Sequence, residues 1–97
     1  MPSAEFEQAA EASKRLKTKP TDSELLELYA LFKIANGEDF SKATQPGIFD
    51  IRGKAKYNAW KKEVDAGVTA DQAEKRYIEA IEALQAKYGV QETTAAT

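Results

Sequence analysis

The chain contains neither cysteine nor histidine. Without cysteine it can form no disulfide, present no thiolate nucleophile and build no cysteine-based zinc site. Without histidine it lacks the commonest general base and the commonest ligand of transition metals. An enzyme would have to rely on paired carboxylates or on a lysine. We therefore expect no catalytic residue, no metal site and no cofactor, which favours a binding protein over an enzyme.

Long apolar stretches are also missing. No run approaches the roughly 18 residues that mark a membrane-spanning helix. The N-terminal stretch, MPSAEFEQAAEASKR, carries Glu5, Glu7 and Glu11 where a secretory signal needs a basic start and an apolar run. The final residues, TTAAT, match no retention, peroxisomal or prenylation signal. We therefore expect a cytoplasmic location.

The length of 97 residues allows one domain at most. A hydrophobic content of 42% with 31% charged residues suits a small helical protein with a polar surface. We expect a folded domain over residues 1–90. Residues 91–97 have no hydrophobic periodicity, so we expect them to form a disordered C-terminal tail.

Four segments have the hydrophobic spacing of amphipathic helices, and none alternates like a strand. They cover residues 4–17, 22–36, 50–66 and 69–88. Local capping signals support these limits. The expected N-caps are Ser3, Thr21, Asp50 and Thr69, and the expected C-terminal caps are Gly37 and Gly89. Thr21 with Glu24, and Thr69 with Gln72, have the spacing of capping boxes.

Each helical segment places its apolar residues along one face. The positions expected to be buried are Phe6, Ala9, Ala10, Ser13 and Leu16, then Leu25, Leu28, Tyr29, Phe32 and Ala35, then Gly53, Tyr57, Trp60 and Val64, and finally Ala73, Tyr77, Ile81, Leu84 and Tyr88. Helices that each carry one apolar stripe must share a core. We therefore predict an all-α fold, a four-helix bundle.

The charges are distributed unevenly along the chain. The net charge is −2. Residues 33–62 nevertheless hold seven cations against three acids, whereas residues 1–32 hold four against six and residues 63–97 three against seven. The basic segment includes the long loop 37–49, and loops of this length are often functional. A local positive potential can attract an anion even to an acidic protein.

Helical geometry places some of these cations next to aromatic rings. Tyr29, Phe32 and Lys33 stand at i, i+3 and i+4, so they should form one patch. Lys54 and Lys56 flank the aromatic stripe of the third helix on its two sides. A lysine suits a phosphate as a mobile point charge. The residues alone leave open a nucleic acid, a phospholipid headgroup, a nucleotide cofactor or a merely solvated helix face.

Three longer stretches narrow these alternatives: LKTKPTDSELLELYALFK, QPGIFDIRGKAKYNAWK and RYIEAIEALQAKYG. In order and spacing they resemble the acyl-CoA-binding protein family over residues 3–90. The most specific pieces are the Y-x-x-F-K motif of residues 29–33 and the PG…D-x-x-GKAK-x-x-AW motif of residues 46–60. The resemblance implies a small cytosolic four-helix bundle that binds long-chain acyl-CoA esters without transforming them.

The resemblance also implies roles for individual residues. Tyr29, Lys33 and Lys56 correspond to positions that hold the phosphates of CoA, and Phe32 and Tyr77 to aromatic contacts with the adenine. It is the resemblance that selects Lys56, since helical geometry allows Lys54 equally. Further implied positions near the CoA moiety or the acyl-chain groove are Lys14, Phe6, Ala10 and Leu26. The implied partner is long-chain acyl-CoA, bound by a monomer that meets acyl-CoA-using enzymes or membranes transiently and binds no nucleic acid.

Several positions depart from the family pattern. Phe32 stands where tyrosine is usual, Tyr57 where a second tryptophan is common, and Ile34 where glutamine is usual. The loop before Pro46 and the segment before Thr69 are slightly longer than in the family. These departures bear on chain-length preference and affinity, not on the class of ligand.

Two other functions compete with acyl-CoA binding. A nucleic-acid-binding module would use the same basic and aromatic segment, but the chain is acidic overall and lacks the broad basic stripe that tracks a phosphate backbone. An enzyme acting on the thioester would lack histidine and cysteine, and we expect no carboxylate pair beside the basic patch. The sequence therefore favours a non-enzymatic carrier.

Overall fold

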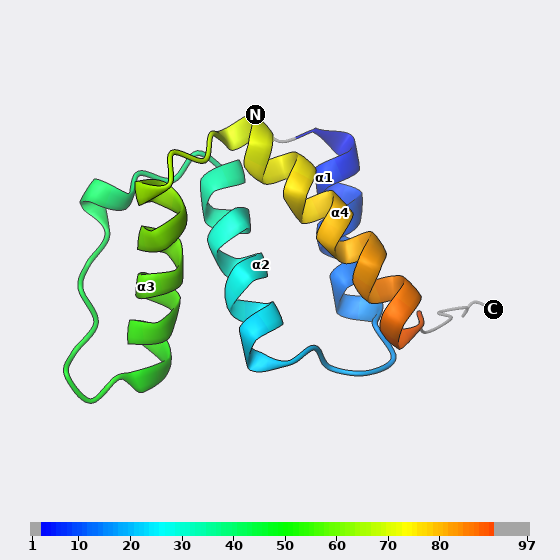
Figure 1. Cartoon of the computed structure of the whole chain (residues 1–97), viewed down its shortest axis with the longest axis horizontal. Coiled ribbons are helices and arrows are strands. Elements are labelled where there is room, and N and C mark those ends of the chain that lie inside the picture. Colours follow the sequence, from blue (N-terminus) through cyan, green and yellow to red (C-terminus); the bar gives the residue numbers. More distant parts are fainter. Residues whose placement is uncertain (1–2, 91–97) are drawn as a thin grey trace.

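The computed structural model describes residues 3–90 and contains four α-helices (Figure 1). These are α1 (Ala4–Ala12), α2 (Asp22–Ala35), α3 (Ile51–Asp65) and α4 (Ala70–Tyr88), with two single-turn 3₁₀-helices, η1 (Ser13–Arg15) and η2 (Phe40–Lys42). Within the described residues, extended pairing is limited to one antiparallel bridge between Leu16 and Val90. None of the helices of residues 3–90 is both long and apolar enough to cross a membrane. The predicted all-α four-helix bundle is confirmed, whereas the predicted tail lies outside the described residues.

Each helix begins next to the residue that caps it. The side chains of Ser3, Thr21, Asp50 and Thr69 accept hydrogen bonds from the backbone N–H groups of Phe6, Glu24, Gly53 and Gln72, respectively. Both predicted capping boxes are complete, because Glu24 and Gln72 accept the N–H groups of their N-cap residues in return. These bonds satisfy donors that a helix start otherwise leaves unpaired. All four predicted N-caps are confirmed.

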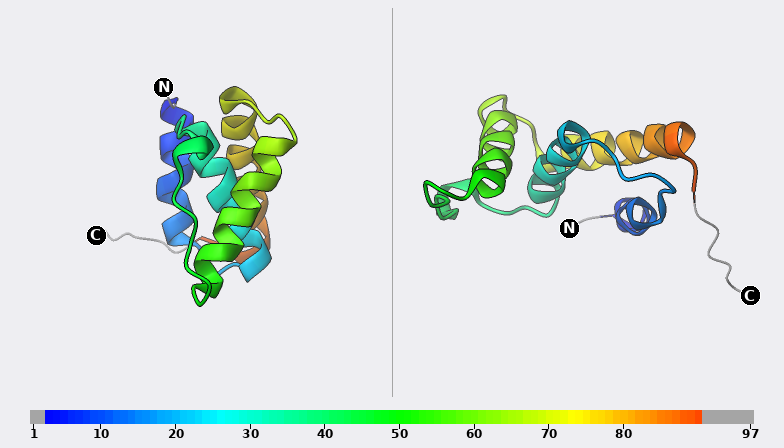
Figure 2. Two further views of the ribbon diagram at one scale, coloured as in Figure 1. Left: turned by 90° about the vertical axis from the view of Figure 1, so that its left-hand side faces the viewer. Right: turned by 90° about the horizontal axis from the view of Figure 1, so that it is seen from below.

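The helices are arranged around α2. It packs against α3 on one side and against α4 on the other, and α1 packs against α4 (Figure 1). The right-hand view in Figure 2 shows the same order, with α3 and the loop before it at one end of the molecule. α2 and α3 run in the same direction, because the loop of residues 36–50 returns along the length of α3 before that helix begins (Figure 1).

The first helix ends earlier than the sequence pattern predicts. The α-helix stops at Ala12, η1 follows, and Leu16 is already extended. The backbone N–H of Lys17 donates to the carbonyl oxygen of Gly89 at 3.0 Å. Because pairing with the segment after α4 needs an extended backbone, this tertiary contact overrides the helical pattern of residues 13–17.

α2 is buried on more than one face. Its buried residues are Leu28, Ala30, Leu31, Ile34 and Ala35. The sequence pattern predicts a single stripe, and its inclusion of Phe32 is wrong, since that side chain is 38% exposed. Because α3 and α4 cover different sides of α2, Leu31 and Ile34 are buried although they lie outside the predicted stripe.

α3, in contrast to α2, buries few of its side chains. Trp60 is its one buried residue, and Gly53 and Tyr57 are only half-buried. The prediction that Val64 belongs to the core is wrong, because its side chain is 38% exposed. α3 packs mainly against α2 and η2, and the described contact of this end with α4 is the ion pair of Glu63 with Arg76, which leaves Val64 partly uncovered.

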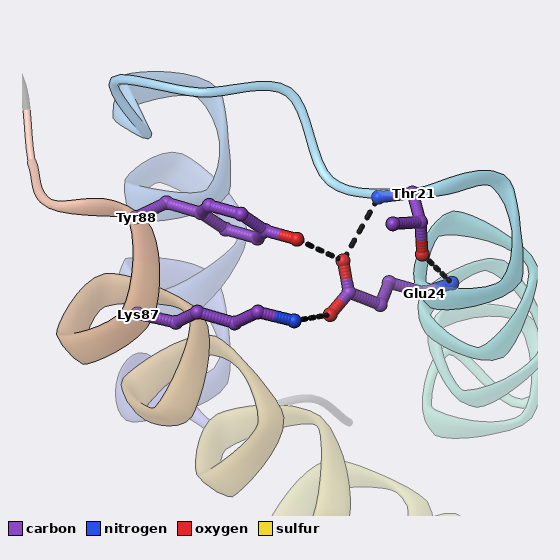
Figure 3. A network of polar contacts seen from close by, with 4 residues as sticks. All are labelled: Thr21, Glu24, Lys87 and Tyr88. Atoms are coloured by element: carbon purple, nitrogen blue, oxygen red, sulfur yellow. Dashed lines mark hydrogen bonds and ion pairs between the residues drawn. The ribbon is translucent and has the colours of Figure 1, made fainter.

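Glu24 ties the start of α2 to the end of α4 (Figure 3). Its carboxylate accepts hydrogen bonds from the Thr21 backbone N–H at 2.8 Å, the Tyr88 hydroxyl at 2.8 Å and the Lys87 ammonium at 3.0 Å. These bonds, that from Thr21 most of all, stabilise the ionised carboxylate and lower the pKa of Glu24 from 4.5 to about 2. One carboxylate thus completes a helix cap and joins two helices that are distant in sequence.

We expect Glu24→Gln to lower the melting temperature by a few degrees at neutral pH. Because the folded state depresses the pKa of Glu24, the stabilisation is complete above the unfolded-state value near 4.5 and is lost as the pH falls towards about 2. The difference between wild type and variant should therefore narrow across this window in thermal melts followed by circular dichroism. Glu82→Gln, at an exposed position of α4, is the control. A difference that persisted unchanged to the lowest pH would contradict this role of Glu24.

Candidate ligand site between α2 and α3

A cavity of about 550 Å³ lies between α2, the loop before α3, and α3. This volume is typical of small-molecule sites. Its wall combines the cations Lys33, Lys42 and Lys56 with aromatic side chains that include Tyr29 and Trp60. The cavity exists because α3 contributes few apolar side chains to its contact with α2.

Two lysines converge on the ring of Tyr29. Tyr29 and Lys33 are four residues apart on α2 and therefore share a face. Lys33 Nζ lies 5.5 Å and Lys56 Nζ 5.4 Å from the centroid of the Tyr29 ring, within the range of cation–π interactions. The structure thus brings together three of the residues singled out from the sequence. Lys54, which helical geometry left as an equal alternative, does not line the cavity.

Carboxylates share the cavity wall with the lysines. The expectation that no carboxylate pair lies beside the basic patch is wrong, because the loop brings Glu38 and Asp39 to this wall and Asp50 lies there too. Lys33 Nζ donates to both oxygens of Glu38, at 2.9 and 3.1 Å, and this contact raises the pKa of Lys33. Hydrogen bonds from Ser41 lower the pKa of Asp39, and the carboxylate of Asp50 caps α3. Each of the three is thus engaged as a hydrogen-bond acceptor.

Phe40, from η2, holds the loop against α3. Its ring centroid lies 4.8 Å from that of Tyr57 and 5.0 Å from that of Trp60, which it meets edge-on at 81°. Trp60 is 6% exposed, and its indole N–H has no acceptor among the described residues. Lys33 Nζ lies 5.5 Å from the centroid of the Trp60 ring. The rings of Phe40, Tyr57 and Trp60 therefore form one packed group, and the ammonium group of Lys33 lies near its Trp60 ring.

Phe32 belongs to a second aromatic cluster, which joins α1, α2 and α4. The ring centroid of Phe6 lies 5.6 Å from that of Phe32 and 4.9 Å from that of Tyr77, and the last two lie 5.9 Å apart. The structure therefore divides the predicted patch, because Phe32 contacts α1 and α4 while Tyr29 and Lys33 face α3. Burial raises the pKa of the Tyr77 hydroxyl. Neither Phe32 nor Tyr77 lines the α2–α3 cavity.

The remaining residues singled out from the sequence lie outside this cavity. Lys14 is 73% exposed and its Nζ lies 3.5 Å from a carboxylate oxygen of Glu11. Ala10 and Leu26 are half-buried, on α1 and α2, and Phe6 is fully packed within the second cluster. The structure does not place Phe6, Ala10 and Leu26 on the wall of the α2–α3 cavity.

Sequence reasoning missed Glu38, which lines the cavity, and Phe40, whose ring packs on the lining residues Tyr57 and Trp60. Phe40 carried a usable signal, because a large aromatic side chain within the polar loop 37–49 needs a packing partner. Glu38 carried none. Its contact with Lys33 depends on how the chain turns after Gly37, whose φ of 75° is a left-handed conformation that favours glycine.

Comparisons with known proteins agree with this architecture. The model of the family described as Acyl CoA binding protein matches residues 3–81. The chain belongs to this family. An acyl-CoA-binding protein homolog from Manduca sexta is 47% identical over 87 residues, which cover 90% of this chain and 94% of the relative. A homolog from Drosophila melanogaster is 46% identical over 88 residues, covering 91% and 99%.

A solved structure shows the same fold. The crystal structure of Oryza sativa Acyl-CoA-Binding Protein 2 superposes with a TM-score of 0.74, covers 96% of each chain and is 28% identical in sequence. The resemblance to the acyl-CoA-binding protein family is thereby confirmed. The structure shows the surroundings of two residues that depart from the family pattern. Ile34 is 7% exposed within the α2 core, where an apolar side chain is favoured. Tyr57 packs on the ring of Phe40.

We expect Phe40→Ala to destabilise the fold by about 1–3 kcal/mol, less than the loss of a fully buried phenylalanine, because this ring is half-buried. Trp60 is the single tryptophan and should become more exposed, so its emission should shift to longer wavelength. Urea unfolding followed by fluorescence measures both effects. Phe49→Ala is the matched control, since that ring is 91% exposed and should affect neither. An unchanged spectrum for F40A would refute the view that Phe40 covers Trp60.

Proposed function

We propose that this protein binds long-chain acyl-CoA esters without transforming them. It keeps a detergent-like ester in solution, limits its free concentration and delivers it to enzymes. Membership of the acyl-CoA-binding protein family supports acyl-CoA binding and transport in general. The convergence of Lys33 and Lys56 on Tyr29 supports the finer assignment, since it offers an anion two ammonium groups beside a phenol.

The CoA end is assigned to two neighbouring groups of residues. Tyr29, Lys33 and Lys56 hold the phosphates, and a phosphate at Lys33 displaces the carboxylate of Glu38 from its ammonium group. Phe32 and Tyr77 contact the adenine. The partial exposure of Phe32 supports this, because it leaves part of the ring available for stacking. Lys14 approaches the CoA moiety from η1, directly after α1, where its side chain is largely solvated.

The acyl chain is assigned to an apolar groove between helices, near Phe6, Ala10 and Leu26. The family resemblance supports this assignment. Phe6 is fully packed against the rings of Phe32 and Tyr77 before ligand binds, so the chain lies along the edge of this cluster. Ala10 and Leu26 are half-buried and present the remaining apolar surface on α1 and α2.

The two ends of the ligand contribute in different ways. Burial of a methylene contributes about 0.8 kcal/mol, so a sixteen-carbon chain contributes roughly 10 kcal/mol before entropy losses. A hydrogen bond to a charged group contributes about 1.5–3 kcal/mol, so three phosphate contacts contribute about 5–9 kcal/mol. The acyl chain therefore sets the affinity, and the nucleotide end sets the specificity.

We expect palmitoyl-CoA to bind far more tightly than either coenzyme A or palmitate, because each fragment retains only one of these contributions. Calorimetric titration of acyl-CoA esters of increasing chain length, with coenzyme A and the free acid as controls, measures this directly. Equal competition by palmitate would show that the CoA end is not recognised. The same series gives the chain-length preference.

A second test concerns the cations. We expect Lys56→Ala and Tyr29→Phe each to weaken palmitoyl-CoA binding by about ten-fold or more, because each removes one contact to a charged group. Lys54→Ala is the matched control, being the same change two residues away on α3 at an exposed position that does not line the cavity. Lys62→Ala, also exposed on α3, should likewise have little effect. Equal losses for Lys54, Lys56 and Lys62 would indicate diffuse electrostatic attraction without a defined site.

Two rival functions have direct assays. Release of free thiol during incubation with acyl-CoA would reveal a thioesterase, and the carboxylates of Glu38, Asp39 and Asp50 are the groups to substitute first in that case. A steep salt dependence of oligonucleotide binding would reveal a nucleic-acid-binding module. We propose that neither is observed, and that the protein acts as a cytoplasmic monomer without metal or cofactor that meets acyl-CoA-using enzymes or membranes transiently.

A further inference from the structure

The two cations that converge on Tyr29 differ in their ionic partners. Lys33 Nζ donates to both carboxylate oxygens of Glu38, at 2.9 and 3.1 Å. Lys56 Nζ, which lies over the same Tyr29 ring, forms no ion pair with any of residues 3–90. The carboxylate of Glu38 therefore occupies the place beside Lys33 where the proposed function puts a phosphate, whereas the place beside Lys56 holds no carboxylate.

The partners of the Lys33–Glu38 ion pair are held to different degrees. The side chain of Lys33 is 26% exposed, and its ammonium group lies 5.5 Å from the ring centroids of both Tyr29 and Trp60. The side chain of Glu38 is 44% exposed, and within the described part of the chain its carboxylate bonds to Lys33 alone. When the pair separates, Glu38 therefore moves into water and Lys33 stays in the cavity wall.

The other two carboxylates of the wall are bonded to the backbone. Asp39 accepts hydrogen bonds from the backbone N–H and the hydroxyl of Ser41, at 2.9 and 2.7 Å. Asp50 accepts the backbone N–H of Gly53 at 2.9 Å as the N-cap of α3. Each would lose a local cap on moving towards a cation, and such a loss destabilises a helix start. Glu38 can move without that loss.

The backbone keeps Glu38 beside Lys33 even when their side chains separate. The N–H of Glu38 donates to the carbonyl oxygen of Lys33 at 3.1 Å, and the N–H of Gly37 donates to that of Ile34 at 2.9 Å. Both side chains thus leave the backbone at the same end of α2. Because a tethered partner has a high effective concentration, the carboxylate can return to the ammonium group as soon as a bound phosphate leaves it.

We propose that Glu38 is an internal competitor for the ligand phosphate at Lys33, which lowers the affinity for acyl-CoA and speeds its release. An incoming phosphate meets Lys56 first and gains Lys33 when Glu38 turns into water. During release, Glu38 recaptures Lys33 while the acyl chain still holds the ligand, so the phosphate cannot rebind there. This inference rests on the proposed function, and it adds a means of release to a carrier that must deliver its ligand.

The variant Glu38→Gln tests the proposal. It should bind palmitoyl-CoA about two- to five-fold more tightly, the factor expected for loss of a partly exposed ion pair as competitor. Most of this gain should come from slower release. Calorimetry measures the affinity, and stopped-flow displacement of a fluorescent acyl-CoA by excess palmitoyl-CoA measures the release rate. Glu82→Gln makes the same change of charge at an exposed position of α4 outside the α2–α3 cavity, and should leave both unchanged.

Double variants separate direct competition from general repulsion between a carboxylate and the ligand. In a Lys33→Gln background, Glu38→Gln should no longer strengthen binding, because the cation for which the carboxylate competes is gone. In a Lys56→Gln background the gain should persist. A gain that is retained without Lys33 would overturn the proposal, as would an unchanged affinity and release rate in Glu38→Gln.

A probe without an acyl chain keeps this proposal distinct from the proposed function. Titration of the isotope-labelled protein with adenosine 3′,5′-bisphosphate, followed by NMR, should also show tighter binding for Glu38→Gln than for wild type. If palmitoyl-CoA bound no more tightly than this bisphosphate, the proposed function would fail, while the effect of Glu38→Gln on the bisphosphate would still support competition at Lys33. Equal bisphosphate titrations for wild type and Glu38→Gln would overturn the role of Glu38 and leave acyl-CoA binding unaffected.

Discussion

α2 has to present apolar side chains to two neighbours at once, because α3 packs on one side of it and α4 on the other. Leu28, Ala30, Leu31, Ile34 and Ala35 meet this requirement by covering more than one face of the helix. Full burial of a large apolar side chain contributes about 1.5–3 kcal/mol, so much of the hydrophobic stabilisation is concentrated in this one element. The capping box of Thr21 and Glu24 fixes where α2 begins, and the contacts of Glu24 with α4 hold that end in place (Figure 3).

α3 lies on the outer side of α2, and its described contact with α4 is the ion pair of Glu63 with Arg76, so apolar side chains that faced away from α2 would have no partner. With Trp60 as its one buried side chain, the contact between the two helices is incompletely filled and a cavity remains. Cations can line such a cavity because its walls stay partly hydrated. Two ammonium groups near one another would repel, but the face of the Tyr29 ring and the carboxylate of Glu38 offset this repulsion before ligand binds. Under the proposed function, a phosphate replaces the carboxylate of Glu38 at the Lys33 ammonium group, and the released carboxylate, whose side chain is already 44% exposed, returns to water.

The parts of the fold that could be predicted are those with local causes. N-caps and capping boxes involve residues a few positions apart, so Thr21 and Thr69 marked helix starts correctly. The end of α1 could not be predicted from the local sequence, because the backbone of residues 16 and 17 is extended where it pairs with the segment after α4. The exposure of Phe32 and Val64 could not be predicted from a hydrophobic pattern, because the pattern does not show how many neighbours cover each helix or which part of it they cover. In the cavity, spacing alone paired Tyr29 with Lys33, the choice of Lys56 over Lys54 needed the family resemblance, and the contact of Glu38 with Lys33 depends on the path of a loop.

The basic segment illustrates why counting charges is less informative than placing them. Lys33 is bonded to Glu38 and Lys61 to Asp65, so two of its cations already have carboxylate partners. Within the GKAK motif, Lys54 and Lys56 are two residues apart, which on an α-helix is a rotation of about 200°. They must therefore point to nearly opposite sides: Lys56 lines the cavity, and Lys54 is exposed to solvent. The helical period therefore gives the two lysines of one short basic motif different surroundings, the cavity for one and solvent for the other.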